Sequence, residues 1–143
     1  MTVAAILKHK SNDIASVTPY TTISDVTTLL AQRRIGAVLV LDAAGGLSGI
    51  VSERDIMHCL AVHGAGALDM TASQVMTRLV QTATPRTSVG EAMAMMTTGR
   101  FRHIPVLEDG ALVGIVSIGD VVKARLDQQA QEVDSLRAYV TGG

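Results

Sequence analysis

An internal repeat covers most of the chain and limits its possible folds more than any other feature. Pro19 and Pro85 begin two matching segments at an offset of 66 residues, and the offset becomes 65 between Gly49 and Gly114, after a shorter turn. Chance repetition of so many residue types in one order is improbable. The matching segments are 19–26 with 85–92, 38–42 with 104–108, and 49–56 with 114–121.

Each copy predicts the order strand–helix–strand–strand–helix. The first helix is expected over 24–34, with Ser24 as its N-cap, and over 90–99 in the second copy. A single unit of about 60 residues is only marginally stable alone, because it buries little surface. We therefore expect an α+β fold in which the two repeats pack sheet to sheet with pseudo-two-fold symmetry. The predicted strands are 37–41, 47–51, 103–107 and 112–116, each pair followed by a helix that opens at Ser52 or Ser117.

The chain therefore divides into a first repeat over 6–69, a second repeat over 74–128, and a tail over 129–143. From Val121 onward the pattern is helical. The apolar positions of this helix are irregularly spaced, so they are compatible with covering the chain's own core or a partner chain. These positions are Val122, Leu126, Val133, Leu136 and Val140.

Composition argues against several classes of function. Twelve Lys and Arg against thirteen Asp and Glu give a net charge of −1, which provides no drive toward nucleic acid or an anionic membrane. Aromatic residues are 2% of the chain, too few to stack single-stranded bases. The single Cys59 cannot form an intramolecular disulfide, which fits a reducing compartment. Since no signal-peptide core or bilayer-length apolar run is present, we expect a cytoplasmic protein with no nucleic-acid or membrane partner.

A Ser-x-x-Asp pair follows the second strand of each copy, as Ser52 with Asp55 and as Ser117 with Asp120. One interpretation is a capping box that stabilises the start of the helix. The other is a ligand site, in which the helix N-terminus binds phosphate and the Asp accepts hydrogen bonds from two ribose hydroxyls. Duplication at equivalent points favours the ligand interpretation, and the two roles are compatible.

Basic residues near these pairs differ between the copies. Arg54 in the first turn of a helix opposes the helix dipole, although Glu53 offsets part of this cost. An anionic ligand would make Arg54 favourable, while the alternative is a solvated arginine. Gly119 occupies the same position in the second copy, so the two sites should not be equivalent. Arg100, Arg102 and His103 gather at the start of a predicted strand, where the alternative is a solvated basic edge.

The doubled plan resembles a tandem pair of cystathionine-β-synthase-type (CBS) domains, a Bateman module, from about Ile6 to Val122. The matching motifs are Gly-Ile-Val-Ser-Glu-Arg-Asp at 49–55, Arg-His-Ile-Pro-Val at 102–106 and Gly-Ile-Val-Ser-Ile-Gly-Asp at 114–120. The chain looks most like stand-alone bacterial proteins related to IMP dehydrogenase, without its catalytic barrel. The resemblance implies an adenosyl ligand (AMP, ADP, ATP or NAD) in the cleft between the repeats, no metal, and a flat homodimer.

The same resemblance assigns roles to individual residues. It implies that Arg102 and His103 reach phosphates and that Ser16 and Thr82 contact the purine edge. Leu39 departs from the family's usual Pro, which Pro105 supplies in the second copy. Apolar neighbours of these residues are candidates for base contact, with plain core membership as the alternative. The expected nucleotide-binding residues are Ser16, Ala37, Val38, Ser52, Glu53, Arg54, Asp55, Thr82, Arg100, Arg102, His103, Ile104, Pro105, Ser117, Ile118, Gly119 and Asp120.

Catalytic interpretations have less support. His58, Cys59 and His63 offer metal-ligand atoms, but adjacent helical residues diverge and a fourth ligand is lacking. Ser52 as a nucleophile has no marked base. We therefore expect no enzymatic activity and predict a regulatory nucleotide sensor that acts on an unknown target. The alternatives are a nucleotide-independent module that docks a partner protein and a metal-dependent or hydrolytic enzyme.

Overall fold

The computed structural model describes residues 1–10, 14–78 and 80–142 of the 143. It divides the chain into two compact units, and each unit combines segments that are distant in the sequence. Unit 1 contains the described residues of Met1–Asn12, Thr82–Asp109 and Val113–Gly143. Unit 2 contains those of Asp13–Gln81 with Gly110–Leu112.

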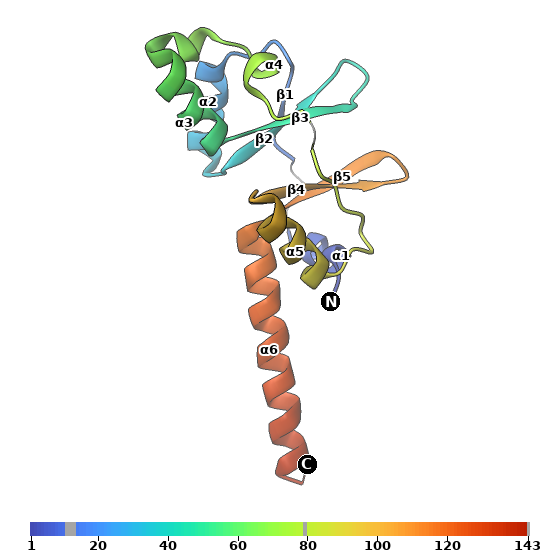
Figure 1. The fold of residues 1–143 in the computed structure, drawn as a ribbon. Coiled ribbons are helices and arrows are strands. Elements are labelled where there is room, and N and C mark those ends of the chain that lie inside the picture. The colour runs from blue at the N-terminus through green and yellow to red at the C-terminus, as the bar shows by residue number, and fades with distance from the viewer. Residues whose placement is uncertain (11–13, 79, 143) are drawn as a thin grey trace. The chain divides into compact units, whose positions relative to one another are not determined.

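Unit 2 is built on a three-stranded sheet in the order β1-β2-β3 (Figure 1). The strands are β1 (Ser16–Val17), β2 (Ala37–Leu41) and β3 (Leu47–Ser52), and the helices are α2 (Ile23–Arg33), α3 (Glu53–His63), the 3-10 helix η1 (Gly64–Asp69) and α4 (Ala72–Val75). β1 runs parallel to β2, and β2 runs antiparallel to β3. Val38, Val40 and Val51 of the sheet pack with Val26 and Leu30 of α2 to form the core of this unit.

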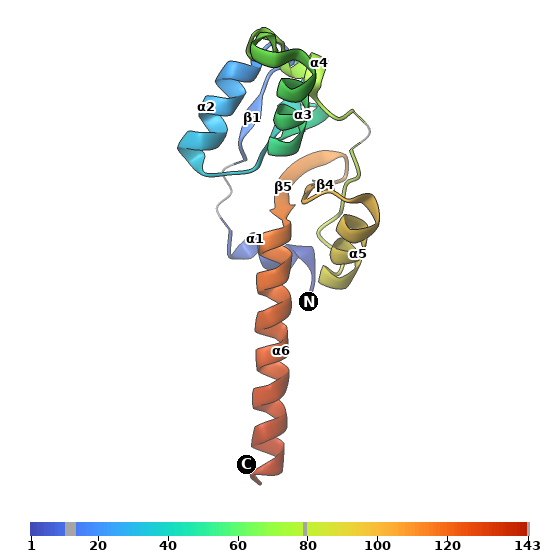
Figure 2. The ribbon, with the colours of Figure 1, turned by 60° about the vertical axis from the view of Figure 1, so that its left-hand side comes forward.

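Unit 1 repeats much of this plan (Figures 1 and 2). Its elements are α1 (Val3–Lys8), α5 (Val89–Gly99), β4 (His103–Glu108), β5 (Ala111–Ser117) and α6 (Ile118–Val140). The predicted first strand of the second repeat is absent from the described residues, where a single parallel bridge joins Ala83 to Val106. That strand prediction was wrong because one bridge is too short to count as a strand. The core contains Val3, Ile104 and Val116.

The segment before each repeat packs on the other repeat. Thr2, just before α1, forms an isolated antiparallel β-bridge with Ser88 of the second repeat. Thr71, just before α4, forms the corresponding bridge with Thr22 of the first repeat.

Two equivalent glycines permit these contacts. A Cβ on Gly114 would lie 2.7 Å from the Leu7 side chain, and a Cβ on Gly49 would lie 2.7 Å from the Met76 sulfur. Glycine therefore recurs at the head of both Gly-Ile-Val-Ser motifs because a neighbouring segment crosses there.

The helix starts confirm most of the predicted pattern and correct one cap. α3 and α6 begin directly after Ser52 and Ser117, as predicted. Ser24 is not a cap, because the hydroxyl of Thr22 accepts the hydrogen bond from Asp25 N at 3.2 Å. Ile23 is fully buried on the same face of α2 as its other buried residues, Val26 and Leu30. The helix therefore has to begin early enough to include Ile23.

The end of α2 also differs from the prediction by one residue. α2 ends at Arg33, and Arg34 takes a left-handed conformation with φ of 54°. Arg100 takes the same conformation after α5, with φ of 56°. Among the described residues, no helix combines the length and the hydropathy needed to cross a bilayer.

Candidate functional site

Both Ser-x-x-Asp pairs form capping boxes at a strand-to-helix junction. The backbone N–H of Asp55 donates to Ser52 Oγ at 3.3 Å, and Ser52 N donates back to Asp55 Oδ2 at 2.9 Å. Asp120 N donates to Ser117 Oγ at 3.1 Å, and Ser117 N donates to Asp120 Oδ2 at 2.8 Å. The capping interpretation is therefore confirmed in both copies, and it fixes each carboxylate at the first turn of its helix.

The half-site of unit 2 is the group around Ser52 and Asp55. The Ser52 hydroxyl lies 3.0 Å from Asp55 Oδ2, and the Thr77 hydroxyl donates to Asp55 Oδ1 at 3.3 Å. Ala37 pairs with Ser52 in the sheet, and Glu53 N donates to the carbonyl of Gly36 at 2.9 Å. The start of β2 is thereby placed beside the start of α3, which brings the predicted residues 37–38 and 52–55 together.

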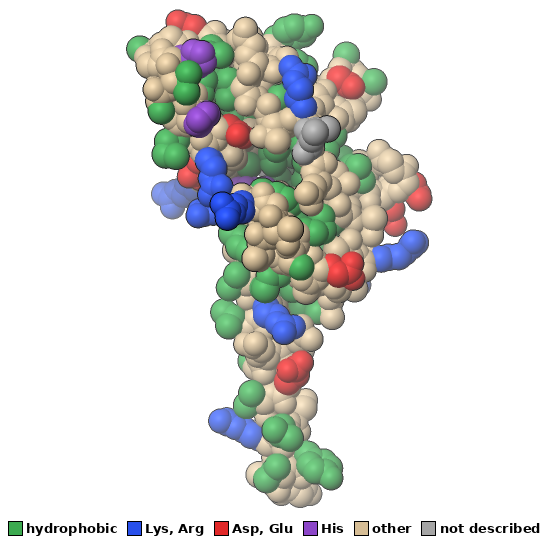
Figure 3. Space-filling model, in the orientation of Figure 1, with side chains coloured by type: hydrophobic (Ala, Val, Ile, Leu, Met, Phe, Trp, Pro, Cys, Tyr) green, Lys and Arg blue, Asp and Glu red, His purple; other side chains and the backbone are tan. Residues whose placement is uncertain are grey.

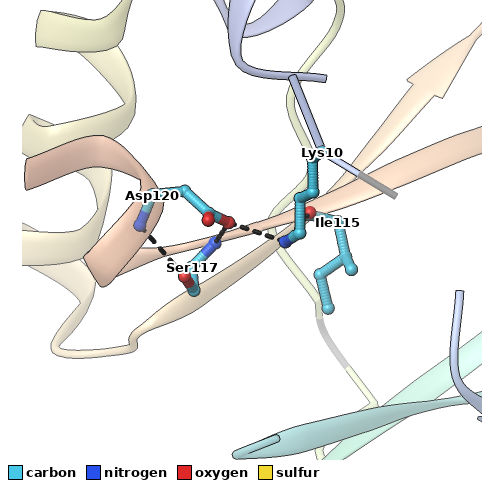
Figure 4. Close-up of polar contacts among 4 residues, drawn as sticks. All are labelled: Lys10, Ile115, Ser117 and Asp120. Atoms are coloured by element: carbon cyan, nitrogen blue, oxygen red, sulfur yellow. Dashed lines mark hydrogen bonds and ion pairs between the residues drawn. The ribbon is translucent and has the colours of Figure 1, made fainter. Parts of the chain in front are cut away.

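The half-site of unit 1 is the group around Ser117 and Asp120, and Lys10 adds a cation to it (Figure 4). Lys10 Nζ lies 2.6 Å from Asp120 Oδ2 and donates to the carbonyl oxygen of Ile115 at 2.8 Å. Partial burial raises the pKa of Asp120, but the hydrogen bonds and charge of Lys10 and the Ser117 N–H outweigh it. The pKa of Asp120 therefore lies below its ordinary value, and the carboxylate is ionised at neutral pH.

The basic residues of the second copy lie beside this half-site to different degrees. Ile118 N donates to the carbonyl oxygen of Arg102 at 2.8 Å, which places the start of β4 next to the N-terminus of α6. Arg102 is exposed, and its neighbour His103 is half-buried. Arg100 is exposed on the turn that ends α5. The structure thus brings Arg102 and His103 together with 117–120.

The predicted base-contacting residues divide into exposed and buried ones. Ser16 is exposed and pairs with Leu39, while Thr82 is exposed and precedes Ala83, whose N–H donates to the carbonyl of Pro105 at 2.9 Å. Ser16 and Thr82 therefore occupy equivalent places. The remaining members of this group are buried, two of them in the hydrophobic cores. They are Ala37, Val38, Ile104 and Pro105.

A cavity of about 570 Å³ lies in unit 2 along one side of α3. Arg54 and Asp55 line it, so it adjoins the half-site of unit 2, and its volume falls within the range of small-molecule sites. Its other lining residues are Met57, His58, Cys59, Val62, His63, Met70, Gln74 and Val75. Among the described residues, no three His, Cys, Asp or Glu side chains form a group able to hold a metal ion.

The two half-sites place a positive charge near the helix N-terminus by different means. In unit 2 the cation is Arg54, in the first turn of α3, and Asp55 is contacted by the neutral Thr77. In unit 1, Gly119 replaces the arginine, and Lys10 supplies the charge from the N-terminal segment. Sequence reasoning predicted non-equivalent sites but missed Lys10.

One sequence pattern indicates how the N-terminal segment that leads to Lys10 packs. Residues 2–7 match residues 71–76 in type, which indicates that both segments dock alike.

Comparison with known proteins agrees with the repeat and the fold. The family model of the CBS domain matches residues 3–62 and 72–127. The CBS domain-containing protein CBSX3, mitochondrial, of Arabidopsis thaliana is 38% identical over 85% of this chain, which spans 61% of that protein's length. The chain spans 22% and 26% of two further relatives from the same plant.

Solved structures support the same assignment. A CBS-domain containing protein from Agrobacterium tumefaciens has a TM-score of 0.85 at 43% identity, with 87% of this chain and 92% of that chain covered. A CBS-domain protein from Burkholderia ambifaria has a TM-score of 0.85 at 39% identity, with 90% and 96% covered.

Two similar structures contain adenosyl compounds. A CBS domain protein from Pyrobaculum aerophilum complexed with AMP has a TM-score of 0.74 at 27% identity, with 84% of this chain and 89% of that chain covered. The CBS domain pair of protein MJ0100, in complex with 5′-methylthioadenosine and S-adenosyl-L-methionine, has a TM-score of 0.79 at 26% identity, with 90% and 98% covered. The duplicated sequence, the α+β fold and both matches to the family model show that this chain belongs to the CBS domain family and carries two CBS domains in tandem.

Proposed function

We propose that this chain is a non-enzymatic regulatory module that binds an adenosyl nucleotide through half-sites carried by its two CBS repeats. The supporting observation is that each repeat carries a carboxylate held at a helix N-terminus by a capping box, with a cation supplied nearby. The similar CBS proteins solved with AMP, or with 5′-methylthioadenosine and S-adenosyl-L-methionine, support the adenosyl class. AMP, ADP, ATP and NAD are the ligands expected within that class.

The ribose is assigned to the carboxylates in this proposal. Asp120 uses Oδ2 to accept the hydrogen bonds from Ser117 N and from Lys10 Nζ. Oδ1 is the atom that would accept hydrogen bonds from the vicinal hydroxyls. On Asp55, Oδ1 receives the Thr77 hydroxyl at 3.3 Å, a long bond that a ribose hydroxyl would replace. The ribose is therefore expected to bind more tightly to the half-site of unit 1.

The phosphates are assigned to basic side chains near the helix N-termini. Arg102 and His103 lie beside the N-terminus of α6, whose first N–H groups and positive dipole end attract anions. Arg54 has the corresponding role at α3. The purine edge is assigned to Ser16 and Thr82, and the buried residues at 37–38 and 104–105 would contribute backbone atoms.

Calorimetric titration tests the proposal directly. AMP, ATP, NAD and S-adenosyl-L-methionine are titrated into the full chain and into Asp55→Asn and Asp120→Asn. Loss of a hydrogen bond to a charged group predicts an affinity lower by about 10–100-fold in at least one variant. Asp127→Asn, an exposed carboxylate on α6, is the matched control and should bind as the unmodified chain does. Unchanged affinity in both site variants would exclude the ribose role.

The second candidate is a nucleotide-independent module that docks a partner protein, and exposed apolar residues on α6 favour it. A ligand that binds the native state must raise its apparent stability. A thermal-shift screen in which no adenosyl compound stabilises the chain would therefore support this second function over the first.

The remaining parts of the proposal follow the family resemblance. We expect a homodimer that signals to a target protein in the cytoplasm, with repeats over 6–69 and 74–128 and a tail over 129–143. One relative is named as mitochondrial, so the compartment of this chain has to be determined by direct localisation of the tagged protein.

A further inference from the structure

The distal part of α6 is a helix without a packing surface in its own unit. Val121 and Ala124 are the buried residues of α6. From 125 to 140 every residue is exposed except the half-buried Gln128. Figures 1 and 2 show this part of α6 extending beyond the rest of unit 1, and Figure 3 shows hydrophobic side chains along it. Helical segments of about 15 residues without tertiary packing are marginal in water, so a partner on the apolar side would stabilise this part of α6.

The exposed apolar residues of α6 form a heptad seam once Gln129 is included. Successive positions are spaced four, three, four, three and four residues apart, the pattern of a two-stranded coiled coil. Leu126, Val133 and Val140 take position a, and Val122, Gln129 and Leu136 take position d. In the distal heptad, Val133 at a with Leu136 at d is the combination that favours a pair of helices. The seam residues are Val122, Leu126, Gln129, Val133, Leu136 and Val140, and the five apolar ones are 42–75% exposed.

The seam lies on a different side of α6 from the surface that packs on unit 1. With about 100° of rotation per residue, the mean direction of the seam is roughly 130° away from that of Val121 and Ala124. The positions farthest from the seam are polar or small, as expected for the solvent side of a coiled coil. These are Asp127, Gln128, Gln131, Asp134, Ser135 and Ala138.

Charges beside the seam favour a second copy of α6 in parallel orientation. In a parallel pair, Glu132 at position g would face Arg137 of the other copy at position e, which gives two attractive pairs. In an antiparallel pair, Glu132 would face its own counterpart. Lys123 would then face Arg137, and both contacts are repulsive. Self-pairing in parallel is therefore the arrangement in which the flanking charges agree with the apolar seam.

We infer that the heptad seam of α6 is the interface through which two copies of this chain associate as a parallel coiled coil. The inference specifies the homodimer of the proposed function and depends on that part of it alone. It does not require nucleotide binding, so the two fail independently: a chain that dimerises through α6 without binding any nucleotide refutes the sensor function and leaves the interface intact.

Sedimentation equilibrium of the full chain tests the interface. The unmodified chain should approach twice its monomer mass as its concentration rises. Leu136→Glu places two charges in the seam and should raise the dissociation constant by at least about 100-fold, because two buried Leu side chains are lost. Ser135→Glu, the same change on the solvent side, should leave it unchanged. A monomer at all concentrations, or equal association by the unmodified chain and Leu136→Glu, would overturn the inference.

Two experiments test the orientation. Val140→Cys, at the distal end of the seam, should form a disulfide-linked dimer on mild oxidation, while the native Cys59 is buried and remains reduced. Glu132→Arg and Arg137→Glu should each weaken association, and the double variant should restore it. Failure of Val140→Cys to cross-link, or stronger association in Glu132→Arg alone, would refute the parallel arrangement.

Discussion

Replacement of Lys10 by Met removes the ammonium that joins the N-terminal segment to the second repeat. Lys10 lies 2.6 Å from Asp120 Oδ2 and donates to the Ile115 carbonyl at 2.8 Å, and the side chains of the ion pair are 32% and 26% exposed. Hydrogen bonds to charged groups contribute about 1.5–3 kcal/mol, while exposed pairs contribute about 0.2–1 kcal/mol. A partly exposed pair lies between these limits. We expect Lys10→Met to lower the free energy of unfolding by about 1–2 kcal/mol at neutral pH.

The pH dependence of this loss follows from the lowered pKa of Asp120. A carboxylate whose pKa is lower in the folded chain than in the unfolded one adds stability above the unfolded value, about 3.9. That stability disappears as the pH falls through the folded value. The cost of Lys10→Met should therefore be constant above about pH 5 and shrink below about pH 4, where only the bond to the Ile115 carbonyl remains.

Urea unfolding of a double-mutant cycle measures the coupling. Lys10→Met, Asp120→Asn and the double variant should give a coupling energy of about 1 kcal/mol at neutral pH. The coupling should decrease as the pH falls below about 4 and disappear once the carboxylate is protonated. Lys8→Met, an exposed lysine of the same segment, is the control and should change stability by less than about 0.5 kcal/mol. Zero coupling at neutral pH, or coupling that persists in acid, would refute the assignment of this ion pair.

Four further variants test the fold by urea unfolding. Gly49→Ala should destabilise by about 1–3 kcal/mol, because its Cβ would lie 2.7 Å from the Thr77 carbonyl oxygen, whereas Gly90→Ala, with open space in α5, should stabilise by about 0.5–1 kcal/mol. Equal effects of the two would exclude the close crossing. Ser117→Ala should cost about 0.5–2 kcal/mol through the lost cap, and no change would mean that the capping box contributes nothing. Arg34→Gly should raise stability by about 0.5–1 kcal/mol, since φ is 54° there, and a loss would show that the arginine side chain matters more than its backbone.

Local features of the fold could be predicted from the sequence. Ser52 and Ser117 as helix starts followed from a hydroxyl residue between an apolar run and a helical pattern, and both are N-caps. The cap at Ser24 failed because Thr22 offers the same chemistry two residues earlier. The burial of Ile23 decided between them, and burial depends on packing that a local pattern does not contain.

The site shows where sequence reasoning stops. Asp120 was predicted as a ligand residue from its own motif, but its ion pair with Lys10 joins residues 110 positions apart. That contact depends on which repeat the N-terminal segment packs against, and periodicity within either copy says nothing about it. The helical tail was predicted correctly, whereas the exposure of its apolar side became visible only in the folded unit.

The exchange of segments between repeats has a consequence for how the chain acquires its structure. Val3 is fully buried in a core completed by Val116 and Val121, which the ribosome makes more than a hundred residues later. The helix α1 therefore cannot bury Val3 until nearly the whole polypeptide has been synthesised. Cleavage of the chain between the repeats would give two fragments, each of which lacks a helix that the other fragment carries. Recovery of the native fold would therefore require both fragments together.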